Sequence, residues 1–423
     1  MVVARSRRIL IATGLLLALA PGLGQAIPWD GAGAIPPSRT PPPKRPDPLC
    51  EQSYADDPPR GGAPLTFGIG PGVAGQSGAT QTTPVVPERP ALRDAAIRQL
   101  AGHRAFVLRL NRLFESGGQR AIAAFARLAR HYGRLGVQIE LQVRYHPTAA
   151  HNGDVRRWLS FVAAVVRTFG SMPFVTSLQI ANEVNLNFSP NTSDGAYRNA
   201  TTALIRGVIT AKALARRLHD RQLRIGFNYA WRFDARADAA FWRTLGRSGG
   251  AALRRATDWV GVDIYPGTYV PPPSAVLHLG DALLEGLAQV RKCYMPLAGF
   301  SARTPMRIEE TGWPTGAGRS PAAQNQAMRA IVGTANAYRG TYNITDLRWF
   351  DLRDNNSHAT GVESHFGLLD DQYSPKPGFA TYRRLIARWG ARQPSARPAP
   401  RLLQSAGHPQ VPRQIQVMSP GAE

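Results

Sequence analysis

The sequence predicts a (β/α)₈ barrel, and three observations support this fold class. Short apolar runs typical of strands alternate eight times with amphipathic runs typical of helices between residues 63 and 392. That span, roughly 330 residues, is the size of one (β/α)₈ barrel with modest insertions. Strands that alternate with helices favour a parallel sheet, and eight such units favour a closed barrel over an open doubly wound sheet.

Each expected strand is a run of four to seven mostly apolar residues. Most are rich in β-branched or aromatic side chains, which fit a buried parallel sheet. In chain order, the expected strands are 65–70, 106–110, 137–143, 175–181, 223–229, 259–265, 306–310 and 347–350.

Each expected helix shows apolar residues three or four positions apart. Pro90 falls in the first turn of the first helix, where its missing N–H costs nothing. The second helix is rich in alanine and arginine, with the arginines on the polar face. In chain order, the expected helices are 89–101, 121–135, 155–169, 197–219, 237–246, 275–291, 321–338 and 379–389.

The segments outside residues 63–392 do not resemble a folded domain. Residues 1–26 have a basic start, an apolar middle and small residues near Ala26, which predicts a signal peptide and export. Ser6-Arg7-Arg8-Ile9-Leu10 also resembles a twin-arginine signal. Residues 27–62 are rich in proline and predict an extended tether. Residues 393–423 predict a disordered tail. We therefore expect a secreted protein, extracellular or associated with the cell wall.

The chain is strongly basic, with 51 Lys+Arg against 28 Asp+Glu and a formal net charge of +23. Solvated helix faces explain scattered arginines such as Arg127 and Arg130. Attraction to an anionic cell-wall polymer or acidic polysaccharide is the second interpretation. An exported chain without a nucleic-acid-binding module predicts no nucleic-acid partner. The apolar run near the start is too short for stable membrane insertion. We expect a monomer.

The chain has two cysteines, Cys50 and Cys293. In an oxidising compartment they could form a disulfide, but two free thiols are equally compatible with the sequence. No CxxC motif or His/Cys cluster indicates a structural metal, and we expect neither metal nor cofactor.

Two strand-ending glutamates carry the functional prediction. Glu183 follows the apolar run 177–182, and Glu310 ends the run 306–310. In a parallel barrel the carboxyl ends of all strands meet at one face, so these side chains can lie across a cleft from each other. Two carboxyl groups about 5 Å apart can hydrolyse a glycosidic bond with retention of configuration. The sequence therefore predicts a two-carboxylate glycosidase site.

The motifs around these residues resemble the superfamily of retaining (β/α)₈ glycoside hydrolases, with the acid/base on strand four and the nucleophile on strand seven. Asn182-Glu183 matches the asparagine that precedes the acid/base in those families. Glu310-Thr311-Gly312-Trp313-Pro314 is similar to the nucleophile strand of plant-type β-1,3-glucanases. Strand order and motif spacing extend the resemblance over residues 65–392. The resemblance implies that Glu183 is the general acid/base and Glu310 the nucleophile, and that Asn182 binds the sugar 2-hydroxyl.

The resemblance also implies four supporting residues. Arg109 is placed like the arginine that holds the nucleophile ionised, and Tyr265 like the strand-six tyrosine that donates to it. Trp349 resembles the aromatic platform beneath the sugar next to the cleavage point. His146 is a further candidate for substrate binding.

Two departures from the family pattern bear on this assignment. Asp263 stands where many relatives have His or Asn, two residues before the strand-six tyrosine. Glu309 precedes Glu310, and because adjacent strand residues point to opposite faces, only one of the two is expected to reach the cleft. The Thr-Gly-Trp-Pro register favours Glu310.

The motifs leave other functions open. A cell-wall polysaccharide-binding barrel with little catalysis could keep the same residues. A transglycosylase would share every step up to the covalent intermediate. Sugar identity, linkage, and exo or endo action do not follow from these motifs.

Overall fold

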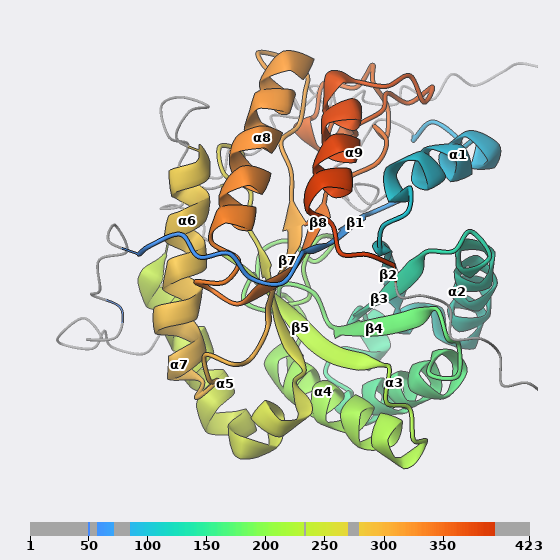
Figure 1. Cartoon of the computed structure of the whole chain (residues 1–423). Helices are drawn as coiled ribbons and strands as arrows, with labels where there is room; N and C mark the ends of the chain where they lie inside the picture. Colours follow the sequence, from blue (N-terminus) through green and yellow to red (C-terminus); the bar gives the residue numbers. More distant parts are fainter. Residues whose placement is uncertain (1–49, 51–56, 72–84, 232–233, 270–278, 394–423) are drawn as a thin grey trace, which may run out of the picture.

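The computed structural model describes residue 50 and residues 57–71, 85–231, 234–269 and 279–393. The expected signal peptide, most of the expected tether and nearly all of the expected tail lie outside these residues. The remainder is the (β/α)₈ barrel that the sequence predicts, with helices surrounding the strands (Figure 1).

Eight strands close into a barrel in the order β1 to β8, and every neighbouring pair is parallel. The strands are β1 (Thr66–Ile69), β2 (Phe106–Phe114), β3 (Gln138–Arg144), β4 (Val175–Ile180), β5 (Arg224–Ala230), β6 (Trp259–Asp263), β7 (Met306–Thr311) and β8 (Ile344–Trp349).

The helices follow the strands in chain order and cover the outside of the barrel (Figure 1). They are α1 (Pro90–Ala101), α2 (Gly118–Gly133), α3 (Val155–Phe169), α4 (Ala200–Arg217), α5 (Ala235–Ala256), α6 (Leu279–Gln289), α7 (Met295–Leu297), α8 (Pro321–Ala337) and α9 (Pro377–Trp389). Their apolar faces pack on the outer side of the strands and form one continuous core.

Two elements extend furthest beyond their expected ends. Strand β2 continues to Phe114, past a slip in its register with β3 between Leu110 and Leu113. Helix α5 continues to Ala256, ten residues beyond the expected end, because the chain re-enters a helix after a kink at Gly250, where φ is 50°. Glycine allows that left-handed turn without the steric cost of a side chain.

The barrel interior contains ion pairs where branched apolar residues are usual. Arg307 on β7 reaches across the barrel to Glu140 on β3, at 3.1 Å. Arg307 also lies 3.2 Å from Asp346, and Arg348 lies 2.8 Å from the same carboxylate. Burial opposes ionisation of Glu140, but the charge of Arg348 and the other arginines lowers its pKa to about 2. The barrel interior is thus occupied by paired charges.

The structure pairs the two cysteines. Cys50 is bonded to Cys293 with their Cα atoms 4.8 Å apart, across 243 positions of sequence. Cys293 lies in the π-helical turn Val290–Tyr294 that continues α6. Asp57 also contacts this region: it pairs with Lys292 and accepts a hydrogen bond of 2.6 Å from Tyr342. The described part of the N-terminal segment is therefore attached to the barrel.

None of the helices in the described part of the chain is long and apolar enough to cross a membrane.

Candidate active site

The end of β4 is held in an unusual backbone conformation that positions Glu183. Ala181 and Glu183 both have positive φ, at 61° and 45°. The backbone N–H of Asn182 donates to Asp194 at 2.8 Å, and that of Glu183 donates to the Asn228 side chain at 2.9 Å. Left-handed backbone costs a non-glycine residue on the order of 1–3 kcal/mol, and such residues cluster at functional sites. These two hydrogen bonds maintain the strained turn.

Glu310 lies at the end of β7 between two donors. Arg109 Nη1, from β2, donates to its Oε1 at 2.6 Å, and the hydroxyl of Tyr265 donates to its Oε2 at 2.7 Å. Gln179 of β4 in turn accepts from Arg109 Nη2 at 2.7 Å, which fixes the guanidinium plane. Both donors stabilise a negative charge on Glu310. The structure thus brings Arg109, Tyr265 and Glu310 together as the resemblance implies.

Glu309 also points inward, so the expected alternation fails at this point. The register of β7 shifts against β6 between Val262 and Asp263, and against β8 between Ile308 and Thr311. Arg307 and Glu309 face inward by ordinary alternation, and Glu309 Oε2 lies 3.7 Å from Arg109 Nε within the barrel. The irregularity turns Glu310 to the same side. Burial and the charge of Glu140 raise the pKa of Glu309 well above its usual value. Burial and the neighbouring Glu140 therefore favour the neutral form of Glu309, beneath the site.

Glu183 lies opposite Glu310. One oxygen each of Glu183, Asp263 and Glu310 lie within 4.8 Å of one another. Glu183 and Glu310 are each 9% exposed, so both carboxyl groups lie in a largely dry site that solvent still reaches. Burial, and then the charge of Glu310, raise the pKa of Glu183 to about 8. One carboxyl group therefore holds a proton at neutral pH, beside a second that is surrounded by donors.

Asp263 is the third carboxyl group of the cluster. It ends β6, is 2% exposed and accepts a hydrogen bond from Asn228. Burial and the charges of Glu310 and Glu183 raise its pKa well above the usual value. Geometrically these three carboxyl groups could hold a cation. However, both oxygens of Glu310 already accept hydrogen bonds, and the Arg109 cation is adjacent, so a metal would have to displace these donors.

Asn182 links the site to its neighbours. Its Oδ1 accepts from Gln142 at 2.7 Å, from Asn228 at 2.6 Å and from Gln179 at 3.1 Å. Its Nδ2 donates to the backbone oxygen of Thr192 at 2.8 Å. An amide nitrogen carries two hydrogens, so one remains for a sugar hydroxyl.

Two predicted site residues, Trp349 and His146, pack against aromatic rings. Trp349 is 0% exposed and its ring packs on Tyr382 of α9, on the outer side of the barrel. The next residue, Phe350, has its ring centre 6.0 Å from that of Tyr265 and is the strand-eight aromatic beside the site. His146 follows β3 and packs against Phe114, with ring centres 4.6 Å apart.

Solved structures resemble this chain over most of its length. A β-glucosidase from Thermotoga maritima in complex with castanospermine matches with a TM-score of 0.55 at 13% identity, covering 79% of this chain and 100% of that chain. A β-glucosidase from Exiguobacterium marinum gives 0.52 at 14% identity, with 71% and 87% covered. One from Exiguobacterium antarcticum gives 0.51 at 15% identity, with 78% and 99% covered. The similarity to these structures shows that the chain has their barrel fold. No family model and no curated protein matches the sequence.

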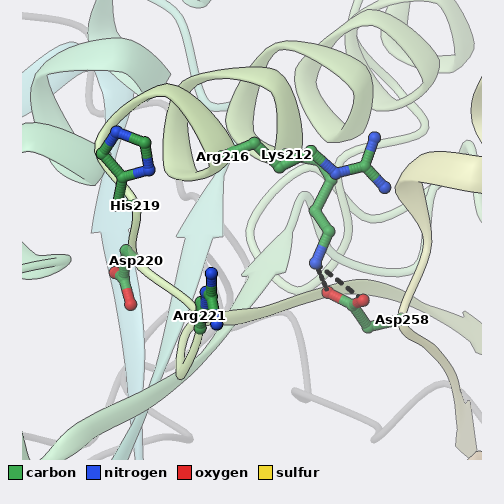
Figure 2. A pocket seen from close by; sticks show the side chains of 6 residues that line it. All are labelled: Lys212, Arg216, His219, Asp220, Arg221 and Asp258. Carbon is green, nitrogen blue, oxygen red and sulfur yellow. Dashed lines mark hydrogen bonds and ion pairs between the residues drawn. The ribbon is translucent and has the colours of Figure 1, made fainter.

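A hollow of about 420 Å³ lies at the other end of the barrel, lined by residues that precede β5 and β6 and by the end of α4. Figure 2 shows that Lys212 reaches Asp258 there, at 2.6 Å and 2.7 Å from its two oxygens. Asp258 also accepts from the backbone N–H of Ile225 at 2.7 Å. These contacts join the starts of two strands, and active sites of this fold lie at the opposite end.

The residues that sequence reasoning missed are buried polar side chains within apolar strands. Asn228 and Gln179 hold Glu183 and Arg109 in place, and both are 0% exposed. The one signal in the sequence is a polar residue inside an otherwise apolar strand, as in Phe227-Asn228-Tyr229. A buried amide needs partners, and here the partners are Glu183 and Arg109.

Proposed function

We propose that the chain is a retaining glycoside hydrolase that cleaves a β-linked poly- or oligosaccharide. The observation that carries the proposal is the carboxyl pair, with oxygens of Glu183 and Glu310 within 4.8 Å. Retaining enzymes place the two groups about 5–5.5 Å apart, whereas inverting enzymes need roughly 6.5–9.5 Å to admit a water. The fold shared with β-glucosidases is consistent with this chemistry, although fold alone does not assign function.

In the first step, a Glu310 oxygen attacks the anomeric carbon while Glu183 gives its proton to the departing glycosidic oxygen. Glu310 is thereby esterified, and Arg109 and Tyr265 lose the charge that they stabilise. The charge of Glu310 is one cause of the raised pKa of Glu183, so esterification lowers that pKa. Glu183 can then accept a proton from water in the second step, and the attack of this water on the anomeric carbon releases the sugar.

We also propose that the protein works outside the cytoplasm. The basic and apolar pattern of residues 1–26 supports export, and the Cys50–Cys293 disulfide is typical of an oxidising compartment. The net charge of +23 supports an anionic polymer as a partner in that setting.

The test is reducing-end release from β-glucans, galactans, xylan, mannan and bacterial cell-wall glycans. The mature protein is compared with Glu310→Gln, and Glu285→Gln on the exposed side of α6 is the matched control. We expect release by the parent and the control, and a loss of at least about a thousandfold in Glu310→Gln. Equal release by Glu310→Gln would refute the site. No release, with retention of one polymer, would identify a binding barrel instead.

A further inference from the structure

Arg112 occupies a strained position at the catalytic end of β2. It lies in the slip of register between β2 and β3, and its φ is 74°. A left-handed conformation at a non-glycine strand residue is uncommon and is maintained only where the surroundings enforce it. Arg112 is half-buried, and among the charges that act on it are those of Arg144 and Glu310. It is thus a cation near the nucleophile.

Arg112 forms no ion pair with a carboxylate in the described residues, although the charges of Glu310 and Glu363 act on it. Arg109 pairs with Glu310 at 2.6 Å, and Arg144 pairs with Asp194 at 2.6 Å. Within the described ranges, no hydrogen bond or ion pair includes Arg112. Burial and the charge of Arg144 lower its pKa to about 9, so the guanidinium remains charged at neutral pH. A half-buried charge without a partner is costly, and an anionic ligand would offset that cost.

The neighbouring side chains extend this positive region. Phe114 is the register partner of Arg144, whose guanidinium lies 5.9 Å from the Phe114 ring centre. Arg144 Nη2 is buried without a hydrogen-bond partner. Next to Phe114, burial and the charges of Arg144 and Arg112 lower the pKa of His146. The ends of β2 and β3 therefore bring two guanidinium groups near each other, and among the described residues only Arg144 has an ion pair with a carboxylate.

We propose that Arg112 binds an anionic substituent on the sugar chain at the catalytic site, so that the substrate is an acidic β-linked glycan. A guanidinium offers two parallel N–H donors that match a carboxylate or a sulfate ester. This inference rests on the proposed function and names the substrate class of the same site. It also assigns part of the basic character of the chain to one residue, in contrast to the exposed arginines on the helices.

The experiment compares matched substrates that differ only in charge. β-1,3- and β-1,4-glucan oligosaccharides are each prepared in neutral form, oxidised to the carboxylate at C6, and sulfated at C6. We expect kcat/KM of the parent to be about 10- to 100-fold higher for an anionic form, the range of one charge-assisted hydrogen bond. The carboxylate and sulfate arms identify the preferred anion.

Three variants assign the preference to Arg112. Arg112→Gln should bring the anionic-to-neutral ratio of kcat/KM close to one, and Arg112→Lys should keep part of it. Arg130→Gln, on the exposed face of α2, removes the same charge and should keep the full ratio. Thermal unfolding checks that each variant is folded. If Arg112→Gln is not folded, the comparison of the parent with Arg112→Lys is the test.

Two results would overturn the inference. One is a parent that cleaves neutral and anionic forms equally well. The other is an Arg112→Gln variant that loses the same factor on both forms, which would mean that Arg112 acts through Glu310. If the parent cleaves nothing, the proposed function fails, and affinity electrophoresis in the carboxylated glucan then decides this inference separately. Retardation of the parent that is lost in Arg112→Gln would support an anion site at Arg112. No retardation of the parent, or equal retardation of both proteins, would exclude one.

Discussion

Glu183 retains its proton at neutral pH because it is buried and because Glu310 lies beside it. Its folded-state pKa is raised to about 8, so the acid form, which the proposed mechanism uses to protonate the leaving oxygen, is lost as pH rises through about 8. We expect kcat/KM on an unactivated glycoside to fall tenfold per pH unit above that value. A rate that rises through pH 8 would contradict this role.

A matched substrate separates Glu183 from other groups. A dinitrophenyl glycoside has a leaving group that needs no proton, so the alkaline fall should disappear for the first step. Glu183→Gln should lose about 10²–10⁴-fold on the unactivated glycoside and much less on the dinitrophenyl glycoside. Similar losses on both would indicate that Glu183 has a structural role.

At the scale of single residues, the sequence indicates the groups that follow an apolar strand directly. Asn182-Glu183 and Glu310 are found in this way, and the structure places them in one cluster. The sequence does not reveal which partner holds each group, because Gln179 and Asn228 become neighbours only when the barrel closes. The sequence also does not show which of the adjacent residues Trp349 and Phe350 faces Tyr265. The backbone at the end of β8 places Phe350 beside Tyr265 and Trp349 beside Tyr382.

At the scale of elements, the end of β7 depends on a close approach to β8. A side chain at Gly312 would place its Cβ 2.3 Å from the backbone oxygen of Phe350. Glycine is therefore required in the Glu310-Thr311-Gly312 turn for steric reasons, independent of substrate. Gly333 in α8 offers a contrast, because a Cβ there would meet nothing within 4 Å.

We predict opposite effects for the same substitution at these two glycines. Gly312→Ala should lower the free energy of unfolding by about 1–3 kcal/mol and should also lower kcat, since Glu310 must shift with the strand. Gly333→Ala should raise the free energy of unfolding by about 0.5–1 kcal/mol, because alanine favours a helix interior. Denaturant unfolding and kcat on one substrate measure both effects. A neutral Gly312→Ala variant would contradict the packing described for β7.

The alternation of strands and helices predicts the barrel because periodicity and length depend on local sequence. The shift of register at Glu309 is not predicted, because the order of apolar and polar residues in the strand does not indicate a bulge. The length of α5 is missed for a similar reason: glycines at 246, 249 and 250 read as a helix end, and the chain instead re-enters the helix.

At the scale of the whole molecule, the Cys50–Cys293 disulfide joins the N-terminal segment to the helical turn that follows α6. We predict that Cys50→Ser/Cys293→Ala lowers the free energy of unfolding by about 2–4 kcal/mol. Reductant should lower the Tm of the parent and leave that of the double variant unchanged. An equal Tm for the parent with and without reductant, after mass spectrometry has confirmed reduction, would contradict a stabilising role.

Ion pairs connect the site to the charged residues in the barrel interior. Arg109 contacts Glu310 above and lies 3.5 Å from Glu140 below, and Glu140 pairs in turn with Arg307. Buried pairs of this kind add little net stability, but removal of one partner leaves a buried charge. Glu310, the proposed nucleophile, is therefore held by contacts that span the barrel from β2 and β3 to β7.

The stereochemical course of the reaction tests the central claim most directly. One oxygen each of Glu183 and Glu310 lie within 4.8 Å of each other, which is shorter than the roughly 6.5–9.5 Å that an inverting enzyme needs to admit a water. Proton NMR of the first minutes of hydrolysis, on whichever glycan the parent cleaves, identifies the anomer released before mutarotation. The two-glutamate mechanism predicts the β-anomer first. Initial release of the α-anomer would contradict it, because inversion needs an attacking water where Glu310 is placed.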